Sequence, residues 1–143
     1  MLDSFIQSNS LRAKILPCIA KGSLIKCRLF SSDSFDLLAV FFARDKIDEK
    51  KLLAVASVES LGKTVASPQS IAPVEAEEVE EITGYKAGFL PPVSIYGVRV
   101  VVDSKVMNAG SVKCLLENEK TLEISPSEIV NANDGAVVAG ITI

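Results

Sequence analysis

A run of seven apolar residues, Leu37 to Ala43, is the sequence feature that most restricts the folds open to this chain. Such a run is far too short to span a membrane and is typical of a strand that is covered on both faces of a sheet. Residues 24–30 just before it alternate between two faces, with Lys26 and Arg28 on the same one. The turn cluster Ser31-Ser32-Asp33-Ser34 separates the two segments. The pattern predicts a hairpin in the middle of a sheet.

Three helices are predicted from their end signals. Asp48 can cap a helix that runs to about Leu61. Glu75 to Ile82 forms a second helix, which Gly84 ends. Ser125-Pro126-Ser127-Glu128 begins a third, with a serine N-cap, proline at the first helical position and glutamate three residues after the cap.

The order of these elements predicts the fold class. Hairpins and helical crossovers are mixed along the chain, which favours an α+β fold. We expect a single domain over residues 1–143, with a mixed, partly barrel-like β-sheet and a few short flanking helices. The remaining predicted elements are a helix over 2–8, strands over 12–16, 63–66, 98–102, 111–116, 121–124 and 136–143, and loops between Pro68 and Pro73 and over 86–97.

The absence of histidine removes a large block of chemistry. The 143 residues include no histidine and three cysteines, Cys18, Cys27 and Cys114. No Ser-His-Asp or Cys-His pair and no His-ligated metal site can form within the chain. The odd cysteine count, without CxxC spacing, indicates neither a disulfide framework nor a zinc knuckle. We therefore expect no metal, no cofactor and a reducing compartment.

Charge is distributed unevenly. The net charge is −3, but residues 1–71 carry 10 basic and 7 acidic side chains, whereas residues 72–143 carry 5 and 11. A broad nucleic-acid footprint needs more positive charge, although a small phosphate-contacting patch is compatible with the acid-free segment 4–32. The first residues lack the basic region of a signal peptide, and no segment is long enough to cross a membrane. A cytoplasmic protein without membrane contact is expected.

The standard catalytic and nucleotide-binding templates are missing. The sequence contains no GxxxxGK[ST], GxGxxG or GxSxG motif. Five glutamates between positions 75 and 81 spread over one helix face, which is typical of a solvated surface. An enzyme built on this chain would have to rely on a lysine, on backbone amides and on groups of the substrate.

Two neighbouring motifs resemble a known family. Thr83-Gly84-Tyr85 follows the acidic helix, and Gly88-Phe89-Leu90-Pro91-Pro92 follows it closely. Together they are similar to the TGY motif and the GxxxP loop of the YbaK/EbsC family, whose members are relatives of the editing domain inserted in bacterial prolyl-tRNA synthetases. Three further segments occur in the family's order, namely residues 23–30, 122–129 and 135–139.

The resemblance implies an aminoacyl-tRNA deacylase that hydrolyses mischarged tRNA in trans, of the Ala- or Cys-tRNA(Pro) type. By position, Lys26 corresponds to the lysine that faces the 3′ end of the tRNA, and we expect Arg28 to contact substrate beside it. Gly88 would begin the substrate loop and act in catalysis, since its backbone can approach the ester or an attacking water closely. An aminoacyl ester is already activated, so orientation and oxyanion stabilisation can suffice without histidine.

Five further residues are expected at the substrate site. Pro92 would stiffen the loop, Thr83 and Gly84 would end the helix and set the exit of the loop, and Tyr85 would pack or contact substrate. Phe89 belongs to the same loop.

This chain departs from the family at three places. Between Pro17 and Lys26 there is no room for the helix that many relatives have. The stretch 114–120 has no glycine and carries two acids where the family has a glycine-rich turn, and the segment 62–83 is longer than usual.

These departures keep a second function open. The chain would then be a catalytically inactive family member that binds a tRNA end, a synthetase or a small molecule. The expected partners are the aminoacylated acceptor end of tRNA and, in addition, an aminoacyl-tRNA synthetase. The sequence leaves open which amino acid and which tRNA are recognised, and the oligomeric state.

Overall fold

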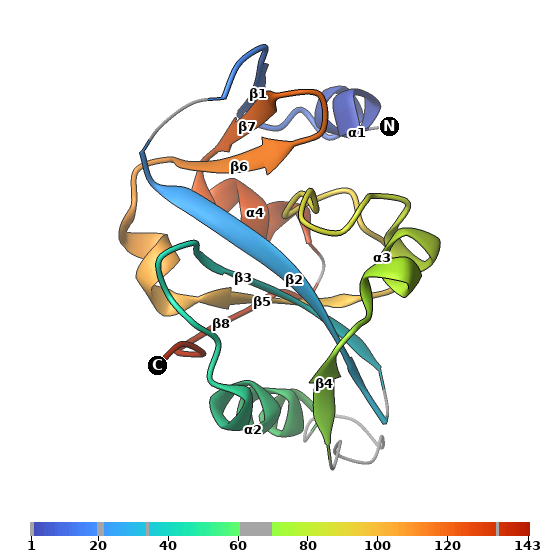
Figure 1. Cartoon of the computed structure of the whole chain (residues 1–143). Helices are drawn as coiled ribbons and strands as arrows, with labels where there is room; N and C mark the ends of the chain where they lie inside the picture. Colours follow the sequence, from blue (N-terminus) through green and yellow to red (C-terminus); the bar gives the residue numbers. More distant parts are fainter. Residues whose placement is uncertain (1, 20–21, 34, 61–69, 134) are drawn as a thin grey trace.

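The computed structural model describes residues 2–19, 22–33, 35–60, 70–133 and 135–143, with the backbone alone for 57–60 (Figure 1). The helices are α1 (Leu2–Ser8), α2 (Glu49–Ser60), α3 (Ala76–Thr83) and α4 (Pro126–Ala132), with a 3-10 turn η1 at Ser104–Asn108. The strands are β1 (Ala13–Leu16), β2 (Leu24–Ser32), β3 (Asp36–Phe42), β4 (Ile71–Pro73), β5 (Arg99–Asp103), β6 (Val112–Leu116), β7 (Lys120–Ile124) and β8 (Val137–Ala139).

The strands of the described residues form one mixed sheet. Its order is β1-β7-β6-β2-β3-β5-β8, and β4 pairs with β2 outside this path. The sheet curls so that β1, β7 and β6 lie well away from β5 and β8, with α4 between them (Figure 1). The α+β fold, with a mixed, partly barrel-like sheet and short flanking helices, is confirmed.

The central hairpin is the one that the apolar run predicts. β2 and β3 pair antiparallel from Ile25 opposite Phe42 to Ser31 opposite Asp36, and β5 lies parallel to β3 on its other edge. Every residue of β3 from Leu37 onward is buried. A strand with both edges paired and both faces covered has no contact with water, which explains why it is continuously apolar.

Two hydrophobic cores cover the two faces of β3. Leu38, Val40 and Phe42 belong to the larger core, which also includes residues of α1, α3 and α4. The alternate residues of β3 belong to a smaller core, where α2 supplies Leu52 and Ala56. The two-residue period of a strand produces this division.

The edge of β2 that faces away from β3 is only partly paired. β6 pairs parallel with Leu24 and Ile25, and β4 pairs antiparallel with Phe30 to Ser32. Within the described part of the chain, no strand pairs with the segment between these two contacts. The amide of Val74, just after β4, bonds to the carbonyl of Leu29 at 3.0 Å, so the sheet is open beside residues 26–28 of β2.

Some local expectations were wrong. The loop expected between Pro68 and Pro73 ends in strand β4, where Pro73 is tolerated because it sits at the end of a short edge strand. The last strand is shorter than expected and ends at Ala139. The predicted strand over 63–66 and the end of the helix near Leu61 lie outside the described residues.

The start of α4 was expected to carry a capping box. The helix does begin after Ser125, with Pro126 in its first turn, but the Ser125 hydroxyl makes no capping bond and lies 2.9 Å from the Ser127 hydroxyl. Glu128 does not reach back to Ser125. Its carboxylate accepts a 3.1 Å bond from the backbone amide of Arg12 and thereby joins α4 to the start of β1.

Candidate functional site

A pocket of about 1070 Å³ lies at the open edge of β2. Residues from both faces of β2 line it, so the pocket passes around the unpaired edge of this strand. Its other walls are the turn after β3, the segment from β4 into α3, the loop after α3 and the end of β6. The break in strand pairing is therefore what creates the cavity.

The two sides of the pocket differ in polarity. Lys26 and Arg28 lie on one face of β2 and are exposed. Ile25, Cys27 and Leu29 lie on the other face, toward the larger core. The alternation of the strand thus gives the pocket a charged outer side and an apolar inner side.

Two thiols belong to the inner side. Cys114 on β6 donates a 3.2 Å hydrogen bond to the carbonyl of Leu90, in the loop after α3. Cys27 lies beside Cys114, and its pKa is raised well above 9.0 by burial first, and then by the hydrogen bond and the charge interaction with Cys114. A neutral thiol is a poor nucleophile, so the half-buried Cys27 acts as a small apolar lining residue.

Gly88 reaches the pocket through the loop that follows α3. Gly84 ends the helix in the left-handed conformation, with φ of 81°, and its amide bonds to the carbonyl of Glu80 at 2.8 Å. Gly88 has φ of 87° and lines the pocket. No atom lies within 4 Å of where a Cβ would stand, so the backbone angle, and not lack of space, favours glycine here.

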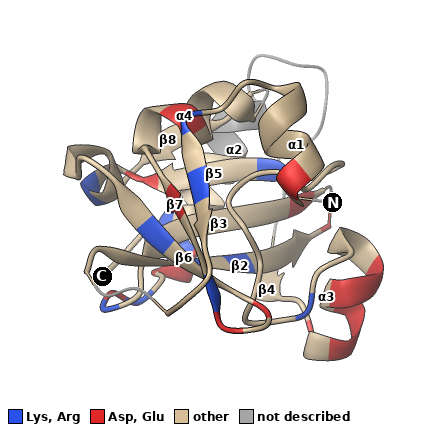
Figure 2. Cartoon of the chain, turned by 90° about the horizontal axis from the view of Figure 1, so that it is seen from above, with Lys and Arg blue, Asp and Glu red and all other residues tan. Residues whose placement is uncertain are grey.

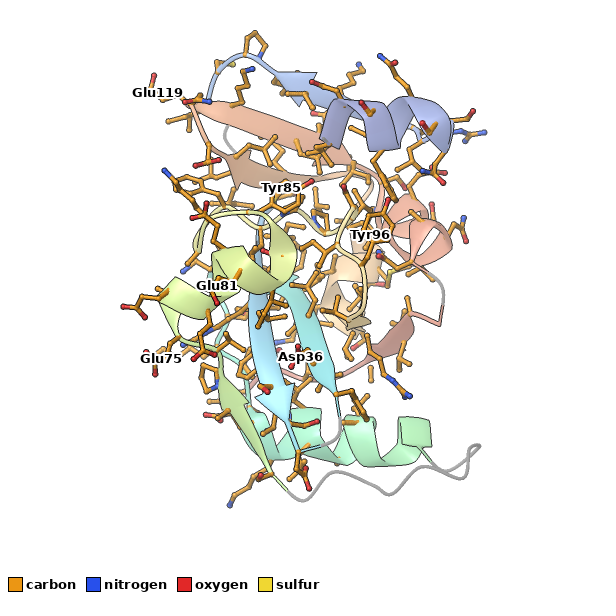
Figure 3. The ribbon with its side chains drawn as sticks, turned by 90° about the vertical axis from the view of Figure 1, so that its right-hand side faces the viewer. Asp36, Glu75, Glu81, Tyr85, Tyr96 and Glu119 are labelled. Atoms are coloured by element: carbon orange, nitrogen blue, oxygen red, sulfur yellow. The ribbon has the colours of Figure 1, made fainter. Side chains whose placement is uncertain are left out.

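A small hydrogen-bond network holds the two ends of this loop. The Thr83 hydroxyl donates to the carbonyl of Val79 at 2.7 Å and accepts from the amide of Tyr85 at 3.1 Å. The Tyr85 hydroxyl donates to the Ser94 hydroxyl at 2.9 Å, and burial raises the pKa of Tyr85. Figure 3 shows Tyr85 above α3, and this residue is half-buried. The Tyr85–Ser94 hydrogen bond therefore connects the two ends of the loop formed by residues 86–93.

The far end of the loop is anchored to α4. Pro92 is buried, and its carbonyl accepts a 2.8 Å hydrogen bond from the side-chain amide of Asn133. The same amide nitrogen lies 2.7 Å from the carbonyl of Ile129 within α4. Phe89, in contrast, is 37% exposed and is absent from the pocket walls.

The residues singled out in the sequence thus fall into two groups. Lys26, Arg28 and Gly88 line one pocket. The others lie outside its walls, in the loop and its anchors: Thr83, Gly84, Tyr85, Phe89 and Pro92.

Sequence reasoning missed the wall formed by the turn after β3. Asp45, Lys46 and Ile47 of this turn and Glu49, the first residue of α2, line the pocket. In the sequence they are part of a short, mostly charged segment, and only the pairing of β3 with β2 brings them to the site. No motif marks them.

The C-terminal tail holds this turn in place. The carbonyl of Lys46 accepts a 2.9 Å bond from the amide of Ile143, and the amide of Asp48 donates a 2.8 Å bond to the carbonyl of Ile141. The tail is held in turn by the buried carboxylate of Asp103, which accepts from the amide of Ile141 at 3.1 Å and from the hydroxyl of Thr142 at 3.2 Å. An aspartate ending an apolar strand is the one sequence signal of this latch.

The turn that departs from the family pattern joins β6 to β7. Asn118 and Glu119 adopt positive φ angles of 62° and 57°, so two residues with side chains occupy a conformation that glycine would favour. Glu117 forms a 3.5 Å ion pair with Lys86, two residues before Gly88. This exposed ion pair connects the acidic turn to the loop after α3.

The described residues also limit other kinds of site. No helix among them is long and apolar enough to cross a membrane. Across the same residues, no group of three or more cysteine, aspartate or glutamate side chains is arranged to hold a metal ion.

Comparison with solved structures shows the fold. The chain superimposes on the hypothetical protein APE2540 with a TM-score of 0.81, at 22% identity, covering 99% of each chain. It superimposes on a protein described as a proposed trans-editing enzyme for prolyl tRNA synthetase with a TM-score of 0.77, at 18% identity, covering 99% of this chain and 94% of the other.

Sequence comparison gives the family. No curated protein sequence matches the chain. The profile of the aminoacyl-tRNA editing domain, however, matches residues 18–132, which include β2, α3, the loop after α3 and the start of α4. The chain therefore belongs to the aminoacyl-tRNA editing domain family, the YbaK family.

Proposed function

We propose that this protein is an aminoacyl-tRNA deacylase that removes wrongly attached amino acids from tRNA in trans. The observation that carries the proposal is the shared pocket: in a chain of the editing-domain family, Lys26 and Gly88, from segments far apart in sequence, line one cavity. The charged outer side suits the 3′ end of a nucleic acid, and the apolar inner side suits an aminoacyl side chain.

Hydrolysis in this pocket needs positioning more than a strong base. Water adds to the ester carbonyl, the bond from the carbonyl carbon to the ribose oxygen breaks, and the proton of the water passes to that ribose oxygen. The ammonium of Lys26 would hold a phosphate or polarise the ester, and the backbone of Gly88 would orient the water or stabilise the oxyanion. The raised pKa of Cys27 speaks against a thiol nucleophile.

The preferred substrate in this proposal is tRNA(Pro) carrying alanine or cysteine. Between β2 and β6 the inner side is lined by Ile25, Cys27, Leu90 and Cys114, of which Cys27 is partly buried and the others are fully buried. An apolar lining of this kind suits a small, uncharged side chain such as that of alanine or cysteine.

A deacylation panel tests the proposal. Purified protein is incubated with Ala-, Cys- and Ser-charged tRNAs, and release of the amino acid is followed for the native chain and for Lys26→Ala. The matched control is Lys120→Ala, because Lys120 is also an exposed strand lysine but lies at the β6–β7 turn, outside the pocket. We expect activity in the native chain and in the control, and loss in Lys26→Ala. No release from any of the three substrates, or full activity in Lys26→Ala, rejects the assignment.

A second candidate is a non-catalytic module that binds a tRNA end or a synthetase. It is favoured by the acidic turn at Glu117-Asn118-Glu119, which replaces the glycine-rich turn of the family. Co-purification with a synthetase, together with absent deacylation, would support this second function over the first.

A further inference from the structure

Three cations line the outer side of the pocket without an anionic partner. Lys26, Arg28 and Lys46 are all exposed and all contribute to its walls. None of them forms an ion pair with another described residue. Arg28 does lie over the ring of Phe30, 5.7 Å from its centroid, which keeps the guanidinium close to the strand.

The three cations follow one another along β2. Lys26 and Arg28 are two residues apart on one face of the strand, so their Cα atoms are separated by about 7 Å. Lys46 lies beyond the first residues of β2, because Phe42 pairs with Ile25 and the amide of Ala43 bonds to the carbonyl of Leu24. The order along the groove is therefore Lys46, Lys26, Arg28.

Acidic side chains are concentrated on the opposite rim. The five glutamates of the 75–81 segment are all exposed, and Figure 2 shows most of the acidic surface of this region on α3. Figure 3 places Glu75 at the start of the helix and Glu81 near its end. At the cationic end, Asp45 is engaged by Lys105, with 3.7 Å between carboxylate and ammonium, which leaves Glu49 as the other pocket-lining acid there.

A row of unpaired cations bounded on one side by acids fits a flexible polyanion better than a compact anion or a protein surface. We infer that Lys46, Lys26 and Arg28 form a track for successive phosphates of the single-stranded 3′ end of tRNA, and that the strand leaves the pocket past Lys46, away from α3. The inference rests on the proposed function and adds Lys46 to the substrate-binding residues. Repulsion by α3 gives the strand its direction.

The track is tested with two substrates that share the aminoacyl ester on the terminal adenosine, one with a polynucleotide backbone attached and one without it. Full aminoacyl-tRNA carries the phosphate backbone, whereas aminoacyl-adenosine carries the same ester with no phosphate. The variants are Arg28→Gln and Lys46→Gln, with Lys120→Gln as the matched control and Lys46→Arg as the conservative variant. Thermal unfolding of each variant checks that it is folded.

The expected result is specific to tRNA. At low salt, kcat/KM for aminoacyl-tRNA falls roughly three- to fivefold in Arg28→Gln and in Lys46→Gln, mainly through KM. The slope of log(kcat/KM) against log[salt] flattens by about 0.7 for each lost contact with a single strand. Lys46→Arg and Lys120→Gln keep the native slope. On aminoacyl-adenosine, Lys120→Gln keeps the native rate, and Arg28→Gln and Lys46→Gln lose much less than they lose on aminoacyl-tRNA.

Failure of the track and failure of the proposed function give different results. If the native chain hydrolyses neither substrate, the proposed function is rejected, and the track with it. If the native chain hydrolyses tRNA but Lys46→Gln and Arg28→Gln match it at every salt concentration, the track alone is rejected, and an acidic protein becomes the better occupant of this face. Equal losses on both substrates also reject the track, because they show damage to the ester site.

Discussion

Asp103 provides the sharpest test of how the pocket wall is built. Its side chain is fully buried, at 0% exposure, and its two carboxylate oxygens accept one bond each from Ile141 and Thr142. The tail that these bonds hold is in turn bonded to Lys46 and Asp48. Asp103→Ala removes both bonds and leaves a buried amide and a buried hydroxyl without partners.

The size of the effect follows from these contacts. A hydrogen bond to a charged group contributes about 1.5–3 kcal/mol, and the cost of keeping a carboxylate out of water offsets part of the two bonds together. We therefore expect Asp103→Ala to lower the free energy of unfolding by about 3 kcal/mol. Asp103→Asn keeps an acceptor for Ile141, and the Thr142 hydroxyl can accept from its amide, so about 1 kcal/mol is expected.

Urea denaturation measures this difference. With an m-value of about 2 kcal/mol per molar urea, Asp103→Ala should move the unfolding midpoint down by roughly 1.5 M, with an unchanged slope. Because the tail supports the turn at Lys46, the folded variant should also show a raised KM for aminoacyl-tRNA. A midpoint within about 0.3 M of the native one would refute the latch. Equal losses in Asp103→Ala and Asp103→Asn would show that charge, and not hydrogen bonding, holds the tail.

Three further perturbations address the loop, the acidic turn and the thiols. Tyr85→Phe removes the hydrogen bond to Ser94, and we expect the free energy of unfolding to fall by about 1 kcal/mol and kcat to fall by a larger factor than KM rises. An unchanged kcat would show that this hydrogen bond does not position the loop. Glu119→Gly removes a side chain from a left-handed backbone position and should raise the free energy of unfolding by about 0.5 kcal/mol, which corresponds to a Tm higher by about one or two degrees. Asn118→Gly should gain less, because asparagine tolerates this conformation. A lower Tm for Glu119→Gly would contradict the strain assigned to this turn. Because the pKa of Cys27 is raised above 9.0 in the folded state, the unfolded chain loses this proton first, so stability is unaffected at neutral pH and falls as pH rises above about 9. Urea midpoints between pH 7 and 10 test this, and Cys27→Ala should show a smaller alkaline loss than the native chain.

Much of the fold follows from local patterns. The hairpin of β2 and β3 was predicted because one strand alternates and the next is wholly apolar, and these patterns depend on burial that the sequence records directly. Gly84 was predicted to end the acidic helix, and it does so in the left-handed conformation. Strand β4 was missed because three residues ending in proline carry no periodic signal, and they become a strand only by pairing with the end of β2.

The candidate site was predictable only in part. Lys26 and Gly88 could be proposed from motif resemblance, and Tyr85 could be placed in the loop, but its bond to Ser94 could not be foreseen. Lys46 had no signal at all, because a lysine in a charged turn looks like any other surface residue. Its place in the same pocket as Lys26 depends on the β2–β3 register.

The sequence by itself determined which chemistry is open to this protein. Without histidine, and with no nucleotide-binding or nucleophile motif, an enzyme built on this chain would have to rely on a lysine, backbone amides and groups of the substrate. Only the tertiary structure decided where that chemistry can occur. The pocket exists because β6 and β4 pair with different ends of β2 and leave the edge between them open, and strand pairing between distant segments is not encoded in any one of them.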